Sequence, residues 1–210
     1  MNAGPDTERL KRTISEAAET RKAGWVLSNH DFTRFATRFG DNLRAAATLF
    51  LSLPGPAFMF QGDELGVPDG PGTNPPLDRH DRDRFRHPMP WDDSPNNGFT
   101  AGTPWLPAFT PPEGSVAAQD GQPGSVLALF RQLIALRSSR RSAAFRFRDS
   151  PPQTILLERD DHLIAVNFRD QEQPVARLGD LVLEATATDA ATDGGDPASL
   201  RAHGAWVAMQ

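Results

Sequence analysis

The sequence predicts an α/β region followed by an antiparallel all-β module, and three observations support this fold class. Residues 7–60 alternate helix-like segments with short apolar runs, and a polar loop follows each run. Helical connections of this kind are typical of parallel strands. A proline-rich segment then interrupts the order. Beyond residue 141, short β-rich runs separated by tight turns indicate an antiparallel module.

The first helix and strand are predicted from the spacing of apolar residues. Residues 7–22 place apolar side chains on one helix face, and Asp6 can cap the first turn by accepting a backbone N–H. Trp25–Ser28 is a short apolar run that predicts a buried strand. The polar tripeptide Asn29-His30-Asp31 ends this strand.

A second helix and strand follow in the same order. Asp41 is expected to cap a helix over Asn42–Leu53, which Pro54-Gly55 ends because proline lacks a backbone donor. Ala57–Phe60 predicts another buried strand, and the polar loop Gln61–Gly66 follows at once. Loops at the C-terminal ends of parallel strands hold the chemistry in such folds. Both polar loops are therefore candidate site segments.

The segment 67–112 is long and dense in proline, yet it contains six large apolar side chains: Phe85, Met89, Trp91, Phe99, Trp105 and Phe109. A structureless loop of this length is uncommon inside a domain. Because these side chains would be costly to leave in water, we predict an ordered excursion that packs on the fold. Trp91 and Trp105 are accordingly expected to be packing residues, not sugar platforms.

The C-terminal third begins with a predicted helix over Val126–Ser139, capped by Ser125. Residues 141–210 are then expected to form a small antiparallel module. Its predicted strands are Thr154–Arg159, His162–Phe168, Val175–Leu178, Leu181–Thr186 and Ala205–Met209.

Composition excludes several classes of function. With 38% hydrophobic and 23% charged residues, the chain has the composition of an ordinary globular protein. Its 210 residues are enough for one domain or one and a half. The net charge of −5 argues against nucleic acid as the main partner. The chain has no cysteine and no apolar stretch long enough to span a membrane. Residues 1–20 lack the apolar core of a signal peptide, so we expect a cytoplasmic, non-redox protein.

Three motifs, taken together, identify a family. They are WVLSNHDFTR at Trp25–Arg34, FMFQGDELG at Phe58–Gly66, and RDRFRHPMPWD at Arg82–Asp92 with SPNNGFTAGT at Ser94–Thr103. An Asn-His-Asp tripeptide alone is common by chance. In this order and spacing, the set closely resembles the α-glucosidase and oligo-1,6-glucosidase branch of glycoside hydrolase family 13. The resemblance is strong over residues 24–140 and looser beyond.

The resemblance implies a position in a larger fold. The family's catalytic domain is a (β/α)8 TIM barrel followed by a β-sandwich domain. Residues 1–140 would supply the last two β/α units and the closing helix of an incomplete barrel, and residues 141–210 the β-sandwich C-terminal domain. The family's aspartate nucleophile and glutamate acid/base follow strands four and five, which these 210 residues do not contain. Since retaining hydrolysis needs both carboxylates, the chain is expected to be inactive alone.

The resemblance also assigns roles to three residues. Asp31 matches the family's transition-state stabiliser, a carboxylate that hydrogen-bonds sugar hydroxyls as the ring gains positive charge. His30 matches a histidine that contacts the same hydroxyls. Arg86 matches an arginine that helps to close the glucose pocket, where its planar fork can engage a carboxylate and a hydroxyl together. The implied substrate is an α-linked glucoside or oligosaccharide, and no cofactor is implied.

Other polar residues are interpreted as structural. Asp63 and Glu64 are expected to hold their loop, and Asp63 stands where the family usually has glutamate. His87 similarly replaces a common threonine. Residues 79–86 are rich in arginine, but aspartates alternate with the arginines and largely cancel the field, so no nucleic-acid partner is expected. Histidine spacings match no metal motif, and no metal site is predicted.

Three interpretations of the whole chain stay open. The first is the C-terminal part of a retaining α-glucosidase-type hydrolase of carbohydrate metabolism. The second is a non-catalytic module that binds carbohydrate or completes a barrel with a partner, which would be the N-terminal barrel segment. The third is a gene fragment without a role of its own. An upstream reading frame encoding strands one to six favours the first, and a separate adjacent gene for that half favours the second.

Overall fold

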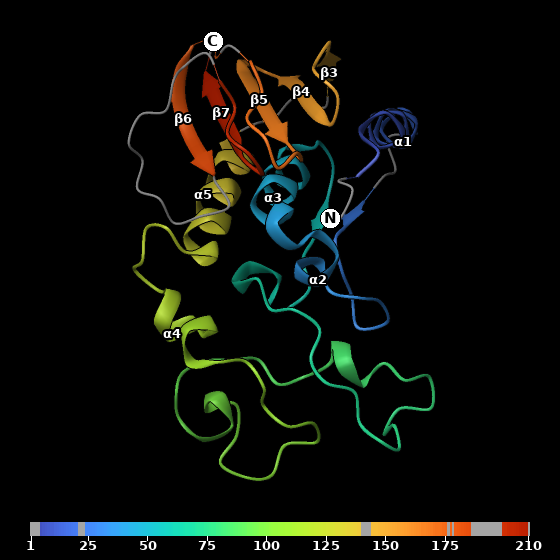
Figure 1. Cartoon of the computed structure of the whole chain (residues 1–210), viewed down its shortest axis with the longest axis vertical. Helices are drawn as coiled ribbons and strands as arrows, with labels where there is room; N and C mark the ends of the chain where they lie inside the picture. Colours follow the sequence, from blue (N-terminus) through green and yellow to red (C-terminus); the bar gives the residue numbers. More distant parts are fainter. Residues whose placement is uncertain are drawn as a thin grey trace. The chain divides into compact units, whose positions relative to one another are not determined.

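The structure, a computed structural model, describes residues 5–20, 24–139, 144–175, 177, 179–185 and 199–209. The chain divides into two units (Figure 1). The sheet unit comprises Met1–Trp25, Asp41–Ala57 and Arg131–Gln210, and the loop unit comprises Val26–Gly40 and Phe58–Phe130. Each unit therefore gathers segments that are distant in the sequence.

The helices and strands follow one another in the predicted order, with several additions. The α-helices are α1 (Thr7–Glu19), α2 (Phe35–Phe39), α3 (Leu43–Ser52), α4 (Val116–Gln119) and α5 (Val126–Ser139). The strands are β1 (Trp25–Val26), β2 (Ala57–Phe58), β3 (Phe145–Arg148), β4 (Thr154–Arg159), β5 (His162–Asn167), β6 (Asp180–Ala185) and β7 (Ala205–Met209). Short 3-10 turns are η1 (Gly40–Asn42), η2 (Asp63–Leu65), η3 (Asp83–Phe85), η4 (Pro95–Gly98) and η5 (Pro112–Gly114).

The sheet unit is built on five strands in the order β3-β4-β5-β7-β6, whose neighbouring strands all pair antiparallel (Figure 1). β4 and β5 form a hairpin in which Arg159 pairs with His162. Its tight turn places Asp160 at a φ of 54°, a left-handed conformation that aspartate tolerates better than most residues. The predicted strand–turn–strand over this segment is confirmed.

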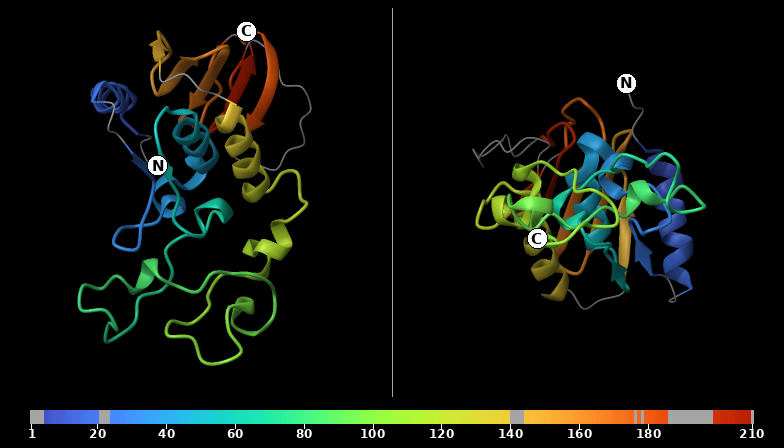
Figure 2. Two further views of the ribbon diagram at one scale, coloured as in Figure 1. Left: turned by 180° about the vertical axis from the view of Figure 1, so that it is seen from behind. Right: turned by 90° about the horizontal axis from the view of Figure 1, so that it is seen from below.

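Both faces of the central strand β5 are covered, which explains why every residue of β5 is buried. Side chains alternate between faces along a strand. Leu163 and Ala165 lie in one apolar cluster with Trp206, Val175 and Leu200. The alternate residues Ile164 and Val166 are fully buried, and α3 packs against β5, β6 and β7 (Figure 2).

Two arginines satisfy the carbonyl groups at the C-terminus of α3. The last carbonyls of a helix have no intrahelical partner. Arg137 of α5 donates to the carbonyl oxygens of Leu51 and Leu53 at 2.8 and 2.6 Å, and Arg159 of β4 donates to that of Ser52 at 2.9 Å. Burial lowers the pKa of both arginines. These contacts fix α3 against the sheet.

The loop unit contains little regular structure. Of the two-stranded sheet that β1 and β2 form, this unit contains only Val26 and Phe58. Leu65, Val67, Met89 and Leu127 make a small buried cluster, against which Phe109 and Val116 pack. Polar contacts of buried residues supplement this cluster.

His87 joins three stretches of the long excursion. Its ring is 2% exposed, and the two ring nitrogens lie 2.8 Å from the carbonyl oxygens of Pro107 and Pro71. The ring also meets Phe109 edge-on, with 4.6 Å between centroids. A Cβ at Gly70 would approach the His87 ring to 2.2 Å, so this position requires glycine. The excursion is ordered, as predicted.

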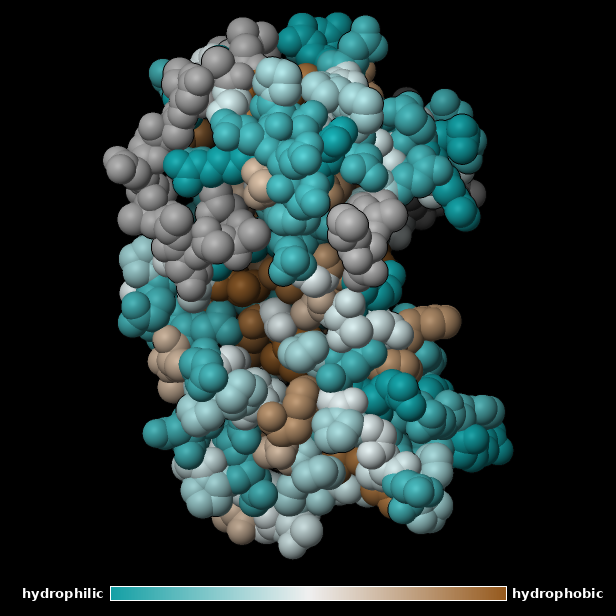
Figure 3. Space-filling view, viewed as in Figure 1, coloured by the Kyte–Doolittle hydropathy of each residue, from teal (hydrophilic) through white to brown (hydrophobic). Residues whose placement is uncertain are grey.

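Its aromatic residues behave less uniformly than expected. Phe85 and Met89 are buried, in agreement with the prediction. Trp91, Phe99 and Trp105 are 50%, 48% and 59% exposed, so the expectation that the two tryptophans pack inward is wrong. On the face drawn in Figure 3, hydrophobic side chains stand among hydrophilic ones.

Several element boundaries differ from the predictions. Asp6 caps α1 by accepting the Arg9 N–H at 3.0 Å, and Ser125 caps α5 by accepting the Ala128 N–H at 3.1 Å, as expected. Asp41 does not cap α3, because the turn η1 occupies that position and Asn42 is the N-cap residue. The helix α2 was not predicted.

In the sheet unit, the strand β3 was not predicted, and Val175 and Arg177 belong to no strand. The remaining residues of the predicted strand Val175–Leu178, and Thr186, lie outside the described residues. The strands described within 141–210 form one sheet, with a helix on one face, where a two-sheet sandwich was expected. No helix of the described ranges is long and apolar enough to cross a membrane.

Candidate functional site

The loop that follows β1 carries two of the three predicted site residues, His30 and Asp31. The Asn29 side chain accepts the backbone N–H of Asp31 at 2.8 Å, a local turn typical of asparagine. Just before this turn, the hydroxyl of Ser28 donates to the carboxylate of Asp63, which is fully buried. The start of the loop is therefore tied to the residues that follow β2.

Asp63 and Arg34 form the polar base of this loop. Asp63 also accepts the Phe60 N–H at 3.0 Å, and Arg34, only 2% exposed, donates to the Gln61 carbonyl at 2.8 Å. Burial raises the pKa of Asp63, although the hydrogen bond from Ser28 opposes the shift. These contacts fit the structural role that we expected of Asp63. Glu64 similarly accepts the Gly62 N–H at 2.9 Å.

Asp31, His30 and Arg86 come together in the structure. The Arg86 Nη2 lies 3.1 Å from Asp31 Oδ1, and its Nε donates to the His30 carbonyl at 2.9 Å. The His30 Nε2 lies 3.4 Å from the same Asp31 oxygen. Asp31 and His30 side chains are 40% and 62% exposed, whereas Arg86 is 20% exposed. The three residues form one partly exposed polar cluster.

Two residues of this cluster, Arg82 and Asp78, were missed by the sequence analysis. Arg82 Nη1 donates to Asp31 Oδ1 at 2.6 Å, while its Nε and Nη2 each donate to Asp78 at 2.8 Å. The spacing of Arg82 and Arg86 on either side of the turn η3 was a signal that could have found one of them. Charge alternation conceals this signal, because alternating arginines and aspartates predict pairing between near neighbours. Arg84 and Asp81 pair in this way, at 2.8 Å.

The electrostatics of the cluster keep Asp31 ionised. Partial desolvation raises the pKa of Asp31, but the hydrogen bond from Arg82 and the charges of His30 and Arg82 outweigh it, so the pKa lies below its ordinary value. Both guanidiniums and the imidazole contact Oδ1. Among the described residues, none bonds Oδ2 of Asp31, which is therefore available to accept hydrogen bonds from a hydroxyl-rich ligand.

The cluster can bind a hydroxyl-rich ligand and stabilise a positive charge on it. Its described residues do not include two free carboxylates. Its second acid, Asp78, is held by two bonds from Arg82, and its side chain is 11% exposed. Retaining hydrolysis requires one carboxylate free to attack and one free to protonate. Within the described ranges, no group of three or more potential ligands is placed to hold a metal ion.

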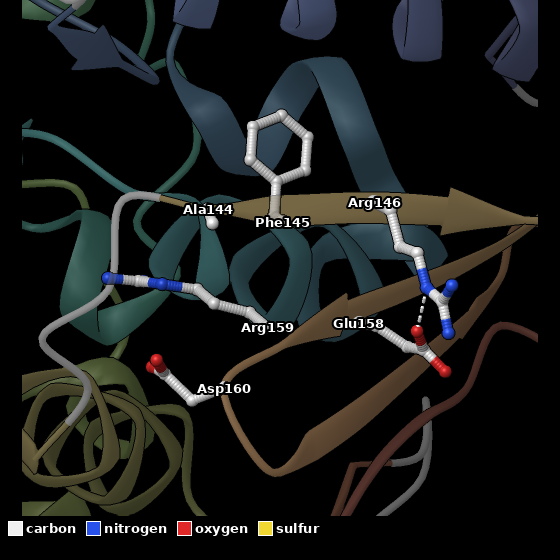
Figure 4. A pocket seen from close by; sticks show the side chains of 6 residues that line it. All are labelled: Ala144, Phe145, Arg146, Glu158, Arg159 and Asp160. Carbon is white, nitrogen blue, oxygen red and sulfur yellow. Dashed lines mark hydrogen bonds and ion pairs between the residues drawn. The ribbon is translucent and has the colours of Figure 1, made fainter.

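A separate cavity of about 350 Å³ lies at the edge of the sheet unit. It is lined by Ala144, Phe145, Arg146, Glu158, Arg159 and Asp160 (Figure 4). Glu158 pairs with Arg146 and, at 2.8 Å, with Arg148. Figure 4 shows the Phe145 ring pointing away from this ion pair. None of the predicted site residues lines this cavity.

Comparison with known proteins shows the family to which the chain belongs. Residues 3–144 match the model of the α-amylase catalytic domain. A probable α-glucosidase of Rhizobium meliloti is 32% identical over 63% of this chain and 27% of its own length. An oligo-1,6-glucosidase of Parageobacillus thermoglucosidasius is 28% identical over 84% of this chain and 40% of its own length.

Solved structures agree with this assignment. A variant of the trehalulose synthase MutB in complex with Tris superimposes with a TM-score of 0.79 at 25% identity, covering 98% of this chain. The chain spans 47% of that structure and less than half of these two curated relatives. Because the family model covers residues 3–144, well over half of the sequence, the chain belongs to the α-amylase catalytic-domain family, glycoside hydrolase family 13.

Proposed function

We propose that this chain supplies the glucose-binding and transition-state-stabilising part of a retaining α-glucosidase-type hydrolase. The observation that carries the proposal is the convergence of His30, Asp31 and Arg86 through contacts of 2.9 to 3.4 Å. The relatives are glucosidases, which supports an α-linked glucoside or short oligosaccharide as the substrate class.

The proposed chemistry follows from the ionised state of Asp31. As the glycosidic bond breaks, the sugar ring flattens and gains positive charge. A carboxylate at its 2- and 3-hydroxyls then binds more strongly, which lowers the barrier. In this proposal, the exposed imidazole of His30 contacts the same hydroxyls. Arg86, already bonded to Asp31, would orient the carboxylate and close the pocket beside it.

The nucleophile and the acid/base are proposed to come from barrel strands four and five of the family fold, which these residues do not include. In this proposal, residues 1–140 form the end of the barrel and residues 141–210 the C-terminal β-domain. The chain alone is then inactive, because Asp31 cannot replace two further carboxylates.

A second candidate function is that of a partner that completes a barrel without itself catalysing a reaction. Val26 and Phe58, on the two short strands, are 53% and 59% exposed, and Met59 is 41% exposed. Large apolar side chains on strands are normally covered by neighbouring elements. A polypeptide supplying barrel strands one to six fits this requirement.

The test is an assay on a chromogenic α-glucoside, with the chain alone and mixed with a polypeptide that supplies strands one to six. We expect no turnover above a heat-killed control for the chain alone, and turnover by the mixture that Asp31→Asn abolishes. Turnover by the mixture that survives Asp31→Asn would support the barrel-completing role. Turnover by the chain alone, lost on Asp31→Asn, would overturn the proposal that it is inactive.

A further inference from the structure

Asp78 has no role in the proposed reaction, yet it contacts Arg82 and Arg86, the two arginines that contact Asp31. Arg82 uses Nε and Nη2 on Asp78, at 2.8 Å each, and its remaining nitrogen Nη1 on Asp31 at 2.6 Å. Arg86 Nη1 lies 3.6 Å from Asp78 Oδ1. A guanidinium presents its donors in a fixed planar fork. Once Asp78 holds one edge of Arg82, the direction of Nη1 is determined.

Asp78 is itself fixed by the fully buried Asp83. The Asp83 carboxylate accepts the Leu77 and Asp78 N–H groups at 2.7 and 3.0 Å and the Thr73 hydroxyl. The hydrogen bond from Thr73, despite desolvation, holds the pKa of Asp83 below its usual value. Asp78 also accepts the backbone N–H of His80 at 3.0 Å. The anchor of the arginines is thus rigidly attached to the turn that carries them.

We propose that Asp78 is a positioning residue, which orients Arg82 and Arg86 so that they hold Oδ1 of Asp31 and leave Oδ2 for the sugar. This inference rests on the proposed function only in treating Asp31 as the carboxylate that faces the sugar. The contacts from Asp78 to Arg82 and from Arg82 to Asp31 belong to the chain itself and need no ligand.

The proposal makes a prediction opposite in sign to the simplest alternative. If Asp78 is only a nearby negative charge, removing that charge stabilises the Asp31 anion and lowers its pKa. If Asp78 positions the guanidiniums, removing its charge releases them. Asp31 then loses its hydrogen bonds, and its pKa rises toward the ordinary value.

The experiment measures the pKa of Asp31 from the pH dependence of its side-chain carboxyl ¹³C shift in the labelled 210-residue chain. We expect Asp78→Asn to raise this pKa. The matched control is Asp81→Asn, because Asp81 lies in the same loop, pairs with Arg84 at 2.8 Å, and has a φ of 53° that asparagine also adopts. It should leave the pKa of Asp31 unchanged. A fall, or no change, for Asp78→Asn would overturn the proposal.

A second variant, Arg82→Lys, covers the case in which Asp78→Asn does not fold. Lysine keeps the positive charge but cannot bond Asp78 through two nitrogens while bonding Asp31 through a third. We expect the pKa of Asp31 to rise here too, and an unchanged pKa would contradict the role of the fork. Neither measurement contains sugar. If the glucosidase assay fails but the pKa of Asp31 changes as predicted, the proposed function is refuted and the positioning role stands. If the glucosidase assay succeeds but the pKa of Asp31 does not change as predicted, the positioning role is refuted and the proposed function stands.

Discussion

The two units of this molecule gain their order in different ways. In the sheet unit, the central strand β5 is buried along its whole length, between α3 on one face and the cluster around Trp206 on the other. In the loop unit, the strand residues Val26 and Phe58 are more than half exposed. Buried apolar area dominates the stability of folded domains, so the sheet unit has the larger share of the stabilising surface.

In the loop unit, polar contacts of buried side chains hold much of the chain in place. Asp63 holds the start of the site loop, Asp83 holds the turn before Arg82, and His87 joins three stretches of the proline-rich excursion. Each contact fixes a local geometry and adds little apolar burial. The difference indicates that polar contacts in the loop unit mainly fix the positions of the site residues. Apolar burial in the sheet unit mainly stabilises the fold.

The largest expected effect is on the catalytic rate, from a substitution at Asp31 that should leave the fold unchanged. In the chain combined with strands one to six, Asp31→Asn should lower kcat by about 10²-fold or more and change KM much less, because its hydrogen bonds strengthen mainly in the transition state. Steady-state kinetics on a chromogenic α-glucoside measures both constants. The amide spectrum of the sheet unit should stay unchanged. A rise in KM with kcat within a few-fold would make Asp31 a ground-state binder.

The next prediction concerns the core of the sheet unit. Ile164→Ala, at a fully buried position of β5, should reduce the free energy of unfolding by about 2–5 kcal/mol, through lost apolar contacts and the cavity left behind. Denaturant titration followed by far-UV circular dichroism measures the change. Ile164→Val is the matched control and should cost only about 0.5–1.5 kcal/mol. Equal, small losses for both variants would show that this strand does not anchor the unit.

A smaller, local effect is expected in the loop unit. Asp63→Asn removes one of the three anions near the buried Arg34 and weakens the contacts to Ser28 and Phe60, at a cost of about 1–3 kcal/mol. Hydrogen exchange should increase at residues 28–31 and at Phe60 and stay constant in β4 and β5. An equal increase in both units would mean that the two are not ordered separately.

Acid should affect the loop unit first. The pKa values of Asp31, Asp78, Asp83 and Asp92 all lie below the ordinary 3.8, each held there by hydrogen bonds to the ionised form. The stability that these four groups contribute is complete above pH 3.8 and is lost as the pH falls through the lower folded values. Asp63, with its raised pKa, has the opposite dependence: its contribution is lost as the pH rises.

In an acid titration of amide spectra, signals of the loop unit should therefore shift or broaden before those of β4, β5 and β7. Simultaneous loss in both units would contradict this order.

Local patterns in the sequence predicted α5 and much of the five-stranded sheet. α5 and its Ser125 cap, and the hairpin of β4 and β5, were predicted because capping, helix periodicity and turn chemistry all lie within a few residues. β3 was missed, although Phe145 and Phe147 alternate with arginines, a period-2 signal. α2 was missed because its N-cap position, Arg34, makes no side-chain capping bond.

The site was predictable only where a motif named it. The family resemblance predicts Asp31, His30 and Arg86, and the structure brings these three residues together. The role of Arg82 was missed because its partner Asp31 is 51 positions away, and the role of Asp78, only four positions from Arg82, was missed with it. Charge patterns along a sequence do not show which of several neighbouring aspartates an arginine will meet.

We infer that the short strands β1 and β2, with the residues that follow them, depend on further barrel strands that the five-stranded sheet does not need. Hydrogen exchange on the 210-residue chain, alone and with strands one to six supplied, tests it most directly. We predict weak protection at Trp25–Ser28 and Ala57–Phe60 and strong protection at residues 154–168 in the chain alone. Supplying the other strands should raise protection only at the first two segments. Uniform strong protection in the isolated monomer would contradict the claim and show that the chain is self-sufficient.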